Sequence, residues 1–339
     1  MEVVGIQKVL ENKYENFLHG IESCLIYQSI KYRDFLTRII GCKSDYLIAI
    51  ENDQIFGALP LMSSDGPLGL VMNSLPFFGS YGGIISKHPL AYDLLSNKYA
   101  EIIQSHSVLS SVIIENPFDK NKKQNQPKNE LDFRIGQFSP INFHENHGAM
   151  LMNSFHGKVR NMIRKAIKEN VKVEIDINYL PFLKETHNEN MNQIGVKIKP
   201  PSFFSELPTF FTNGTDFDLF VATVNHEPVA ALLLFYYNQT VEYFTPVIKQ
   251  SFRSQQPLSL LIYEAMIYAS QKGYKYWNWG GSGKTRSGVY LFKSRWNTRE
   301  VIYQYHISIN PAKKISASAE YLAVQYPYFY VIPYHRLNT

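Results

Sequence analysis

The sequence predicts an α+β protein, of mixed-sheet α/β type, with two domains. Its 339 residues exceed the usual length of one domain, and its 45% apolar content is enough for sizeable cores. Two similar apolar hairpins occur, and a helix and a further strand follow each of them. Strands and helices do not alternate regularly, which argues against a doubly wound parallel sheet.

The two halves of the chain repeat one order of elements. The repeated pairs are hairpins 47–59 and 220–232, helices 89–104 and 257–271, and strands 111–115 and 274–279. Each of these helices has a proline at its start, where the missing N–H costs nothing. The matching order indicates a duplication. We therefore expect domains at residues 1–150 and 151–339, with the main transfer site in the second.

Another helix is predicted at residues 153–169, followed by an alternating strand at 171–177. Arg160, Arg164 and Lys168 are spaced by four residues and form one cationic face of this helix. Such a face is often only solvated. Beside a cleft it would instead hold an anionic group of a substrate, and the sequence leaves both interpretations open.

The predicted strand 241–247 leads into a polar, cationic turn and then into the helix that begins near Pro257. Exposed backbone amides and a helix N-terminus are a common site for phosphate. We assign Val247, Arg253 and Ser254 to contact with a phosphate-bearing donor. A plain connection between strand and helix is the alternative.

The stretch 277–296 combines glycines, cations and aromatic residues, running from Trp277 through a glycine-rich loop to Trp296. Glycines let a backbone approach a ligand closely. A lysine among aromatic rings is partly dehydrated, so its charge acts strongly on a nearby oxygen. We expect a ligand site here rather than an ordinary corner between strands.

Composition and motifs exclude several classes of protein. The net charge of +5 permits an anionic ligand but does not require one. Cys24 and Cys42 match no metal or redox spacing and fit a reducing compartment. The N-terminus resembles no signal peptide, and no apolar run is long enough for a transmembrane segment. We expect a soluble, cytoplasmic protein.

Familiar catalytic motifs are missing as well. The dinucleotide-binding and P-loop glycine patterns do not occur. His144 and His147 are three residues apart rather than four, so we expect a polar loop and no metal site. Ser282 lies in a glycine-rich string but has no evident histidine partner as a nucleophile. Direct attack of an amine or hydroxyl on an activated acyl group remains.

Four motifs then resemble one family in their order along the chain. They are Ser74-Leu-Pro-Phe-Phe-Gly-Ser-Tyr81-Gly-Gly83, Arg160-Asn-Met-Ile-Arg-Lys-Ala166-Ile-Lys-Glu-Asn-Val171, Tyr243-Phe-x-Pro246 through Pro257-Leu, and Trp279-Gly-Gly-Ser282 followed by Gly288-Val-Tyr290-x-Phe292-Lys293-x-x-Trp296. Together they cover most of the chain, roughly residues 27–305. The set resembles the FemABX-like proteins of the GNAT acyltransferase superfamily.

The resemblance implies two tandem GNAT-like domains around a shared cleft. It also implies transfer of acyl or aminoacyl groups to precursors of the cell envelope. Lys293 would polarise the acyl carbonyl, and Arg160 would hold an anionic part of the acceptor. The residues expected to line the acceptor pocket or flank the reaction centre are Tyr81, Gly82, Gly83, Tyr243, Trp279, Ser282 and Tyr290.

One departure concerns the donor. Acetyl-CoA-dependent GNAT enzymes carry a glycine-rich pyrophosphate loop, whereas residues 250–257 contain no glycine. We expect no tightly bound cofactor, and either acyl-CoA or aminoacyl-tRNA as donor, with tRNA a partner in the second case. The acceptor would be an amino group of a cell-envelope glycan, a peptidoglycan or polysaccharide precursor, or a nucleotide-linked form. The alternative is a non-catalytic protein that binds glycan or nucleic acid on the duplicated scaffold.

Overall fold

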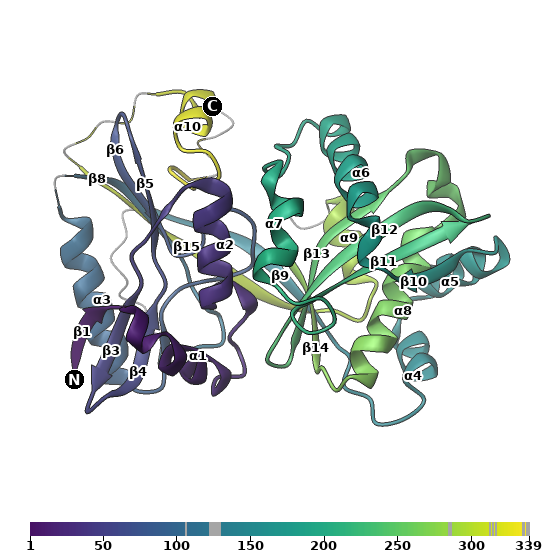
Figure 1. Cartoon of the computed structure of the whole chain (residues 1–339), viewed down its shortest axis with the longest axis horizontal. Helices are drawn as coiled ribbons and strands as arrows, with labels where there is room; N and C mark the ends of the chain where they lie inside the picture. Colours follow the sequence, from purple (N-terminus) through teal and green to yellow (C-terminus); the bar gives the residue numbers. More distant parts are fainter. Residues whose placement is uncertain are drawn as a thin grey trace. The chain divides into compact units, whose positions relative to one another are not determined.

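The computed structural model describes residues 1–105, 107–121, 130–283, 287–311, 313, 315, 317–333 and 336. The chain forms two compact units (Figure 1). The first comprises Met1–Arg134 and Ile302–Thr339, and the second comprises Ile135–Val301. The chain passes between them twice, within β9 (Glu130–Pro140) and within β15 (Arg299–Ile309). Each unit is described by itself.

The first unit contains two β-sheets. The larger has the order β15, β8 (Val108–Ile114), β6 (Gly69–Asn73), β5 (Met62–Gly66) and β2 (Lys43–Ser44). The smaller has the order β1 (Glu2–Gly5), β3 (Leu47–Glu51), β4 (Gln54–Leu59) and β7 (Ile85–Ser86). Its helices are α1 (Glu11–His19), α2 (Ile30–Ile40), α3 (Pro89–Ile103) and α10 (Ala319–Gln325), with short 3-10 turns at Lys8–Leu10 and Ile26–Gln28.

The second unit contains one sheet with the order β10 (Lys172–Ile175), β11 (Phe217–Val224), β12 (Glu227–Tyr237), β13 (Thr240–Ile248), β14 (Tyr276–Ser282) and β9. Its helices are α4 (His147–Ser154), α5 (Gly157–Lys168), α6 (Leu180–Gln193), α7 (Ser202–Phe210), α8 (Pro257–Gln271) and α9 (Gly288–Ser294). Two 3-10 segments, η3 (Ile177–Tyr179) and η4 (Gln250–Gln255), precede α6 and α8.

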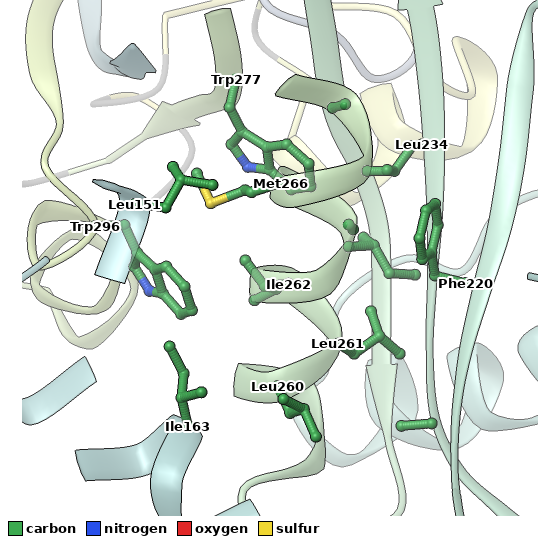
Figure 2. Close-up of a cluster of buried hydrophobic side chains, with 14 of the residues drawn as sticks. Leu151, Ile163, Phe220, Leu234, Leu260, Leu261, Ile262, Met266, Trp277 and Trp296 are labelled. Carbon is green, nitrogen blue, oxygen red and sulfur yellow. The ribbon is translucent and has the colours of Figure 1, made fainter. Parts of the chain in front are cut away.

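Helix α8 is the centre of the second unit's core. It is apolar on nearly all sides, which is typical of a helix packed on both faces. Figure 2 shows its side chains between Phe220 and Leu234 of the sheet on one side and Leu151 and Trp296 on the other. This packing holds α8 rigidly behind β13 and β14, so their shared end has a stable support.

Both units repeat a strand, helix and parallel strand. In the first unit β6 and β8 are parallel with α3 between them in sequence. In the second, β13 and β14 are parallel with α8 between them. The predicted hairpins and helices 89–104 and 257–271 are present, and the mixed-sheet fold class is confirmed.

The compact units divide the chain elsewhere than at the expected boundary between 150 and 151. Residues 135–150 group with the second unit, because β9 pairs with β14. Residues 302–339 group with the first, where Tyr330 exchanges two hydrogen bonds with Asn73 and Tyr326 donates to the Gly69 carbonyl. These contacts fix the C-terminal segment on β6.

The predicted single helix 153–169 is two helices. Phe155 has an extended backbone between α4 and α5. His156 then caps α5, because its Nδ1 accepts a hydrogen bond from the Lys158 N–H at 3.1 Å. The break turns the Phe155 ring onto Trp296, with 5.0 Å between ring centroids, so burial of an aromatic ring outweighs helix continuity.

Candidate functional site

The parallel strands β13 and β14 separate partway along their length. Their paired residues are Thr240 with Tyr276, Val241 with Trp277 and Glu242 with Asn278. Beyond that pair β13 continues beside β12 and β14 continues beside β9, whose pairing with β14 shifts register between Asn278 and Gly281. We call the point after Glu242 and Asn278 the fork. Ligands of open sheets bind at the carboxyl ends of parallel strands, and the fork lies at such an end.

A β-bulge follows the fork directly. Tyr243 pairs with Leu234 and Thr245 with Leu233, so the register skips Phe244. A bulge re-aims side chains and interrupts the regular ladder. At the far end of β13, both the N–H and the carbonyl of Ile248 bind the side-chain amide of Asn190 instead of a neighbouring strand.

Glu242 and Asn278 tie the two strands together at the fork. The Asn278 Nδ2 donates to both carboxylate oxygens of Glu242 at 2.9 Å, and its Oδ1 accepts from the Gly280 N–H at 2.9 Å. Gly280 has φ +70°, a conformation that favours glycine. The sequence interpretation missed Glu242, although a single carboxylate inside the apolar strand 241–247 was a visible signal.

An aromatic cluster lies on one face of the fork. Trp279 packs against Tyr243, Trp296 and Phe292, with centroid distances of 4.9, 5.6 and 6.2 Å. The Trp279 Nε1 donates to the Ser139 Oγ at 2.9 Å. Burial raises the pKa of Tyr243, which keeps its hydroxyl neutral. The structure thus brings the predicted residues Tyr243 and Trp279 together.

Lys293 belongs to the same neighbourhood. It is the sixth residue of α9 and is only 7% exposed. Its Nζ lies 3.4 Å from the carbonyl oxygen of Gly281 on β14. Burial lowers the pKa of Lys293 to about 8, because an ammonium loses hydration there. A cation that is poorly hydrated and beside the strand end has the character needed to stabilise a developing negative charge.

Ser282 and Tyr290 flank Lys293 differently. Ser282 ends β14 with a buried Oγ that has no hydrogen-bond partner among the described residues. The Tyr290 hydroxyl donates to Glu300 at 2.5 Å, which raises the pKa of Tyr290. The Tyr290 carbonyl accepts from Gln137 at 3.4 Å. Of the glycine-rich loop between them, residues 284–286 lie outside the described residues.

Arg160 connects to this cluster through the backbone. Its Nη1 donates to the Phe155 carbonyl at 2.9 Å, and the Phe155 ring packs on Trp296. Arg164 and Lys168, by contrast, are exposed along α5. Within the described residues the predicted cationic face therefore divides: Arg160 is anchored beside the aromatic cluster, while the other two cations face solvent.

The donor residues predicted before α8 have two environments. Val247 is buried in β13. Arg253 and Ser254 are exposed in η4, a compact 3-10 segment that replaces the open loop expected there. Gln256 ends this segment with φ +61° and directly precedes α8. Several amides here already donate within the turn, including those of Phe252 and Gln256.

Tyr81, Gly82 and Gly83 belong to the first unit, where their surroundings are structural. The Tyr81 hydroxyl donates to the Ser23 carbonyl at 2.6 Å, and the Gly82 N–H donates to the Ile114 carbonyl at 3.1 Å. A Cβ on Gly82 would lie 2.6 Å from the Ser74 carbonyl oxygen. Close backbone packing thus explains Gly82 without a ligand, and the expected role of this motif in acceptor binding stays a prediction.

The same segment closes the first unit's parallel pair. Ser74 follows β6, donates its N–H to the Val112 carbonyl and accepts the Ile114 N–H on its Oγ. The Gly82 N–H then donates to the carbonyl of Ile114, the last residue of β8. In the first unit, the end of β8 that corresponds to the fork is therefore bonded to the segment that contains Ser74 and Gly82.

An open pocket of about 790 Å³ lies in the first unit, away from the motifs predicted from sequence. Its floor is apolar and includes Leu70 and Met72, while Arg33, Asp34 and Asp45 contribute to its polar lining. The Arg33 guanidinium is already held by Glu11 and Asp34. None of the residues assigned above to donor or acceptor lines this pocket.

The chain was also compared with known proteins. Residues 157–294 match the family model described as the acetyltransferase (GNAT) domain. The second unit contains a GNAT domain. Among solved structures, FemX is similar with a TM-score of 0.70 and 15% identity, over 91% of this chain and 97% of FemX. The chain has a FemABX-like GNAT fold, as the sequence motifs had indicated.

Two further structures share this fold at lower similarity. One is the C-terminal domain of a candidate lysylphosphatidylglycerol synthetase from Agrobacterium fabrum, with TM-score 0.55, 10% identity and coverage of 88% and 91%. The other is a tandem GNAT protein from the clavulanic acid biosynthesis pathway, with TM-score 0.54, 8% identity and coverage of 91% and 98%. Two GNAT-like domains in tandem are therefore the architecture of this chain. No curated protein matches its sequence.

Within the described residues of this GNAT-fold protein, no group of three or more His, Cys, Asp and Glu side chains is arranged to hold a metal ion. His147, one of the two histidines weighed as ligands, starts α4 and its Nδ1 lies 2.7 Å from the Ser270 Oγ. It thus links α4 to α8. Among the described helices none is long and apolar enough to span a bilayer.

Proposed function

We propose that this protein is an acyl or aminoacyl transferase that transfers its acyl group directly to an amino group of a cell-envelope glycan or precursor. One observation carries the proposal: the buried Lys293 ammonium lies at the end of β14, beside the fork in the GNAT domain. Formation of an amide from an activated acyl group needs an aligned donor, an acceptor amine and a positive group that stabilises the oxyanion.

The chemical step is an addition followed by an elimination. The lone pair of the acceptor amine forms the new C–N bond while the carbonyl π electrons move to oxygen. Lys293 stabilises that oxyanion and remains protonated. The intermediate then expels a thiolate from coenzyme A or a ribose oxygen from tRNA. The acceptor nitrogen loses one proton in the process, so a base must receive it.

Either donor would place its phosphates near the start of α8. The exposed Arg253 is the cation of the turn, and the N-terminus of α8 adds a partial positive charge. Ser254 can add a hydroxyl contact. Val247 is buried in β13, and its predicted contact with the donor stays a prediction. An acyl-CoA pyrophosphate and the phosphates near the aminoacyl end of tRNA fit these groups equally well.

The acceptor class is inferred from the fold's relatives. The similarity to FemX and to a candidate lysylphosphatidylglycerol synthetase favours an envelope precursor over a small metabolite. A nucleotide-linked precursor carries phosphates, and Arg160 would hold them beside the aromatic cluster. Tyr243, Trp279, Ser282 and Tyr290 would line the acceptor site of the GNAT domain.

The test is a product assay with each donor class. Purified protein is incubated with acetyl-CoA or with charged tRNA and a panel of amino-bearing, nucleotide-linked sugars and sugar peptides, and new amides are detected by mass spectrometry. Thermal-shift titrations with acetyl-CoA and free coenzyme A report donor binding independently. Product with one donor class supports the proposal. Ligand binding without product from either donor would favour the non-catalytic alternative.

A lysine pair supplies the matched control. In Lys293→Met the oxyanion contact is lost, and turnover should fall at least about 100-fold. Lys272 also lies near a glycine carbonyl, 3.2 Å from Gly214, but is exposed at the end of α8. Lys272→Met should keep normal turnover. Equal activity of both variants would remove Lys293 from the mechanism.

A further inference from the structure

A second buried lysine lies at the fork. Lys199 belongs to the segment between α6 and α7 and is only 6% exposed. Its Nζ lies over two aromatic rings, 5.2 Å from the Phe244 centroid and 5.6 Å from that of Phe203. These rings are themselves stacked, 5.9 Å apart with an interplanar angle of 15°. The amine is thus held in a defined aromatic environment.

This position is tied to the transfer site through Phe244. That residue is the one skipped by the bulge of β13, and it follows Glu242 at the fork by two positions. Lys199 therefore contacts β13 through the Phe244 ring, whereas Lys293 contacts β14 through the Gly281 carbonyl. Each strand of the fork is thus contacted by a buried amine.

Two buried polar atoms on residues adjoining these contacts have no hydrogen-bond partner within the described part of the chain. One is the Thr245 Oγ1, next to Phe244, and the other is the His187 Nδ1. The His187 Nε2 accepts the Lys199 N–H at 3.3 Å, so a neutral His187 carries its proton on Nδ1. A buried donor and a buried hydroxyl without a protein partner are available to a polar group of a ligand.

We propose that Lys199 is the general base of the transfer, which rests on the proposed function. As the C–N bond forms, the acceptor nitrogen becomes positively charged. Its proton passes to the neutral amine of Lys199, which becomes an ammonium. Expulsion of the donor's leaving group completes the step, and the proton then returns from Lys199 to the leaving group or to water. No oxidant or further reactant is needed.

The charges around the fork are consistent with Lys199 as the general base and Lys293 as the cation that stabilises the oxyanion. Burial lowers the pKa of Lys199 to about 7, below that of Lys293. Burial and the charge of Lys199 also lower the pKa of His187, to about 4, so this ring stays neutral. Charged residues on the surrounding elements include Glu242 on β13, Glu206 on α7, Lys197 on the same segment, and Lys184, Glu185 and Glu189 on α6. Both amines titrate close to neutral pH, so a neutral Lys199 and a protonated Lys293 can coexist, as expected of a base and an electrophilic partner.

The experiment measures kcat/KM against pH with the donor and acceptor found in the product assay. The wild-type profile should be a bell with limbs near pH 7 and pH 8. Lys199→Met should lower kcat/KM about 100-fold or more and abolish the acidic limb. Lys199→Ala should regain activity with added methylamine, which a merely structural lysine would not allow. Lys197→Met, on the same segment but exposed, should keep the wild-type bell.

The possible results distinguish failure of the role proposed for Lys199 from failure of the proposed transferase function. An active wild type with an unchanged acidic limb in Lys199→Met, or no amine rescue of a folded Lys199→Ala, overturns the role of Lys199 and leaves the transferase intact. A folded wild type inactive with both donor classes removes the transferase, and the base with it. Lys199→Arg retains a cation that cannot act as a base, so it should be as impaired as Lys199→Met.

Discussion

The side-chain amide of Asn278 donates to both carboxylate oxygens of Glu242, at 2.9 Å each, at the last residue pair that joins β13 to β14. The two residues are 36 positions apart in sequence. Their contact lies where the two strands separate, at the strand end where we propose that the ligand binds.

Asn278→Asp should strongly destabilise the protein. The change places a second buried carboxylate against Glu242 and removes its donor, at an expected cost of about 3 kcal/mol. Urea denaturation followed by fluorescence of the buried tryptophans measures it. The double variant Asn278→Asp with Glu242→Gln restores an amide facing a carboxylate, so it should recover most of the loss. Additive losses in the double variant would show that the pair is not the cause.

Lys293→Met should be more stable than the wild type at pH 7. Burial lowers the pKa of Lys293 from 10.5 to about 8, so at neutral pH the folded state carries the cost of a buried charge. Removing it should raise the free energy of unfolding by on the order of 2 kcal/mol. Denaturation at pH 7 measures the effect, with Lys272→Met as the exposed control.

The pH dependence of that difference has a definite sign. Between about pH 8 and 10.5 the unfolded chain still binds the proton that folded Lys293 has lost, so wild-type stability rises with pH. The advantage of Lys293→Met should therefore shrink across this window. An advantage that stays constant from pH 7 to 10.5 would contradict the lowered pKa.

Gly82→Ala should destabilise the first unit. Its new methyl group would meet the Ser74 carbonyl oxygen at 2.6 Å and the Leu75 Cβ at 3.0 Å. Neither the backbone nor Leu75 can withdraw without disturbing the strand edge, so we expect a loss of about 2 kcal/mol. Gly5→Ala is the control, because nothing lies within 4 Å of its added Cβ. Thermal unfolding compares the two, and equal melting temperatures would contradict the packing argument.

His156→Ala should weaken the start of α5. The His156 Nδ1 accepts the Lys158 N–H, and losing a helix cap costs about 1 kcal/mol. His156→Asn offers a carbonyl oxygen in a similar place and should retain most of the stability. Both variants keep the bond from the His156 N–H to the Arg295 carbonyl, so the comparison isolates the side chain. A His156→Asn protein as unstable as His156→Ala would indicate a role other than capping.

Local patterns in the sequence were enough for most single elements. Proline at the start and Gly273 at the end framed α8, and its predicted bounds 257–271 agree with the structure. Alternation of apolar residues located the hairpins for the same reason: these periodicities depend only on neighbours in the chain. The helix at 153–169 was predicted wrongly because the packing of Phe155 on Trp296, a contact over 141 positions, overrides local helix propensity.

The sequence by itself determined the fold class and carries motifs that resemble those of FemABX-like GNAT proteins. Only the tertiary structure decided where β13 and β14 part, which carboxylate and amide join them, and that Lys199 lies beside the bulge at Phe244. These features depend on strand order and burial between distant segments. No local periodicity encodes such contacts, because the free energy that maintains them arises only when the sheet has formed.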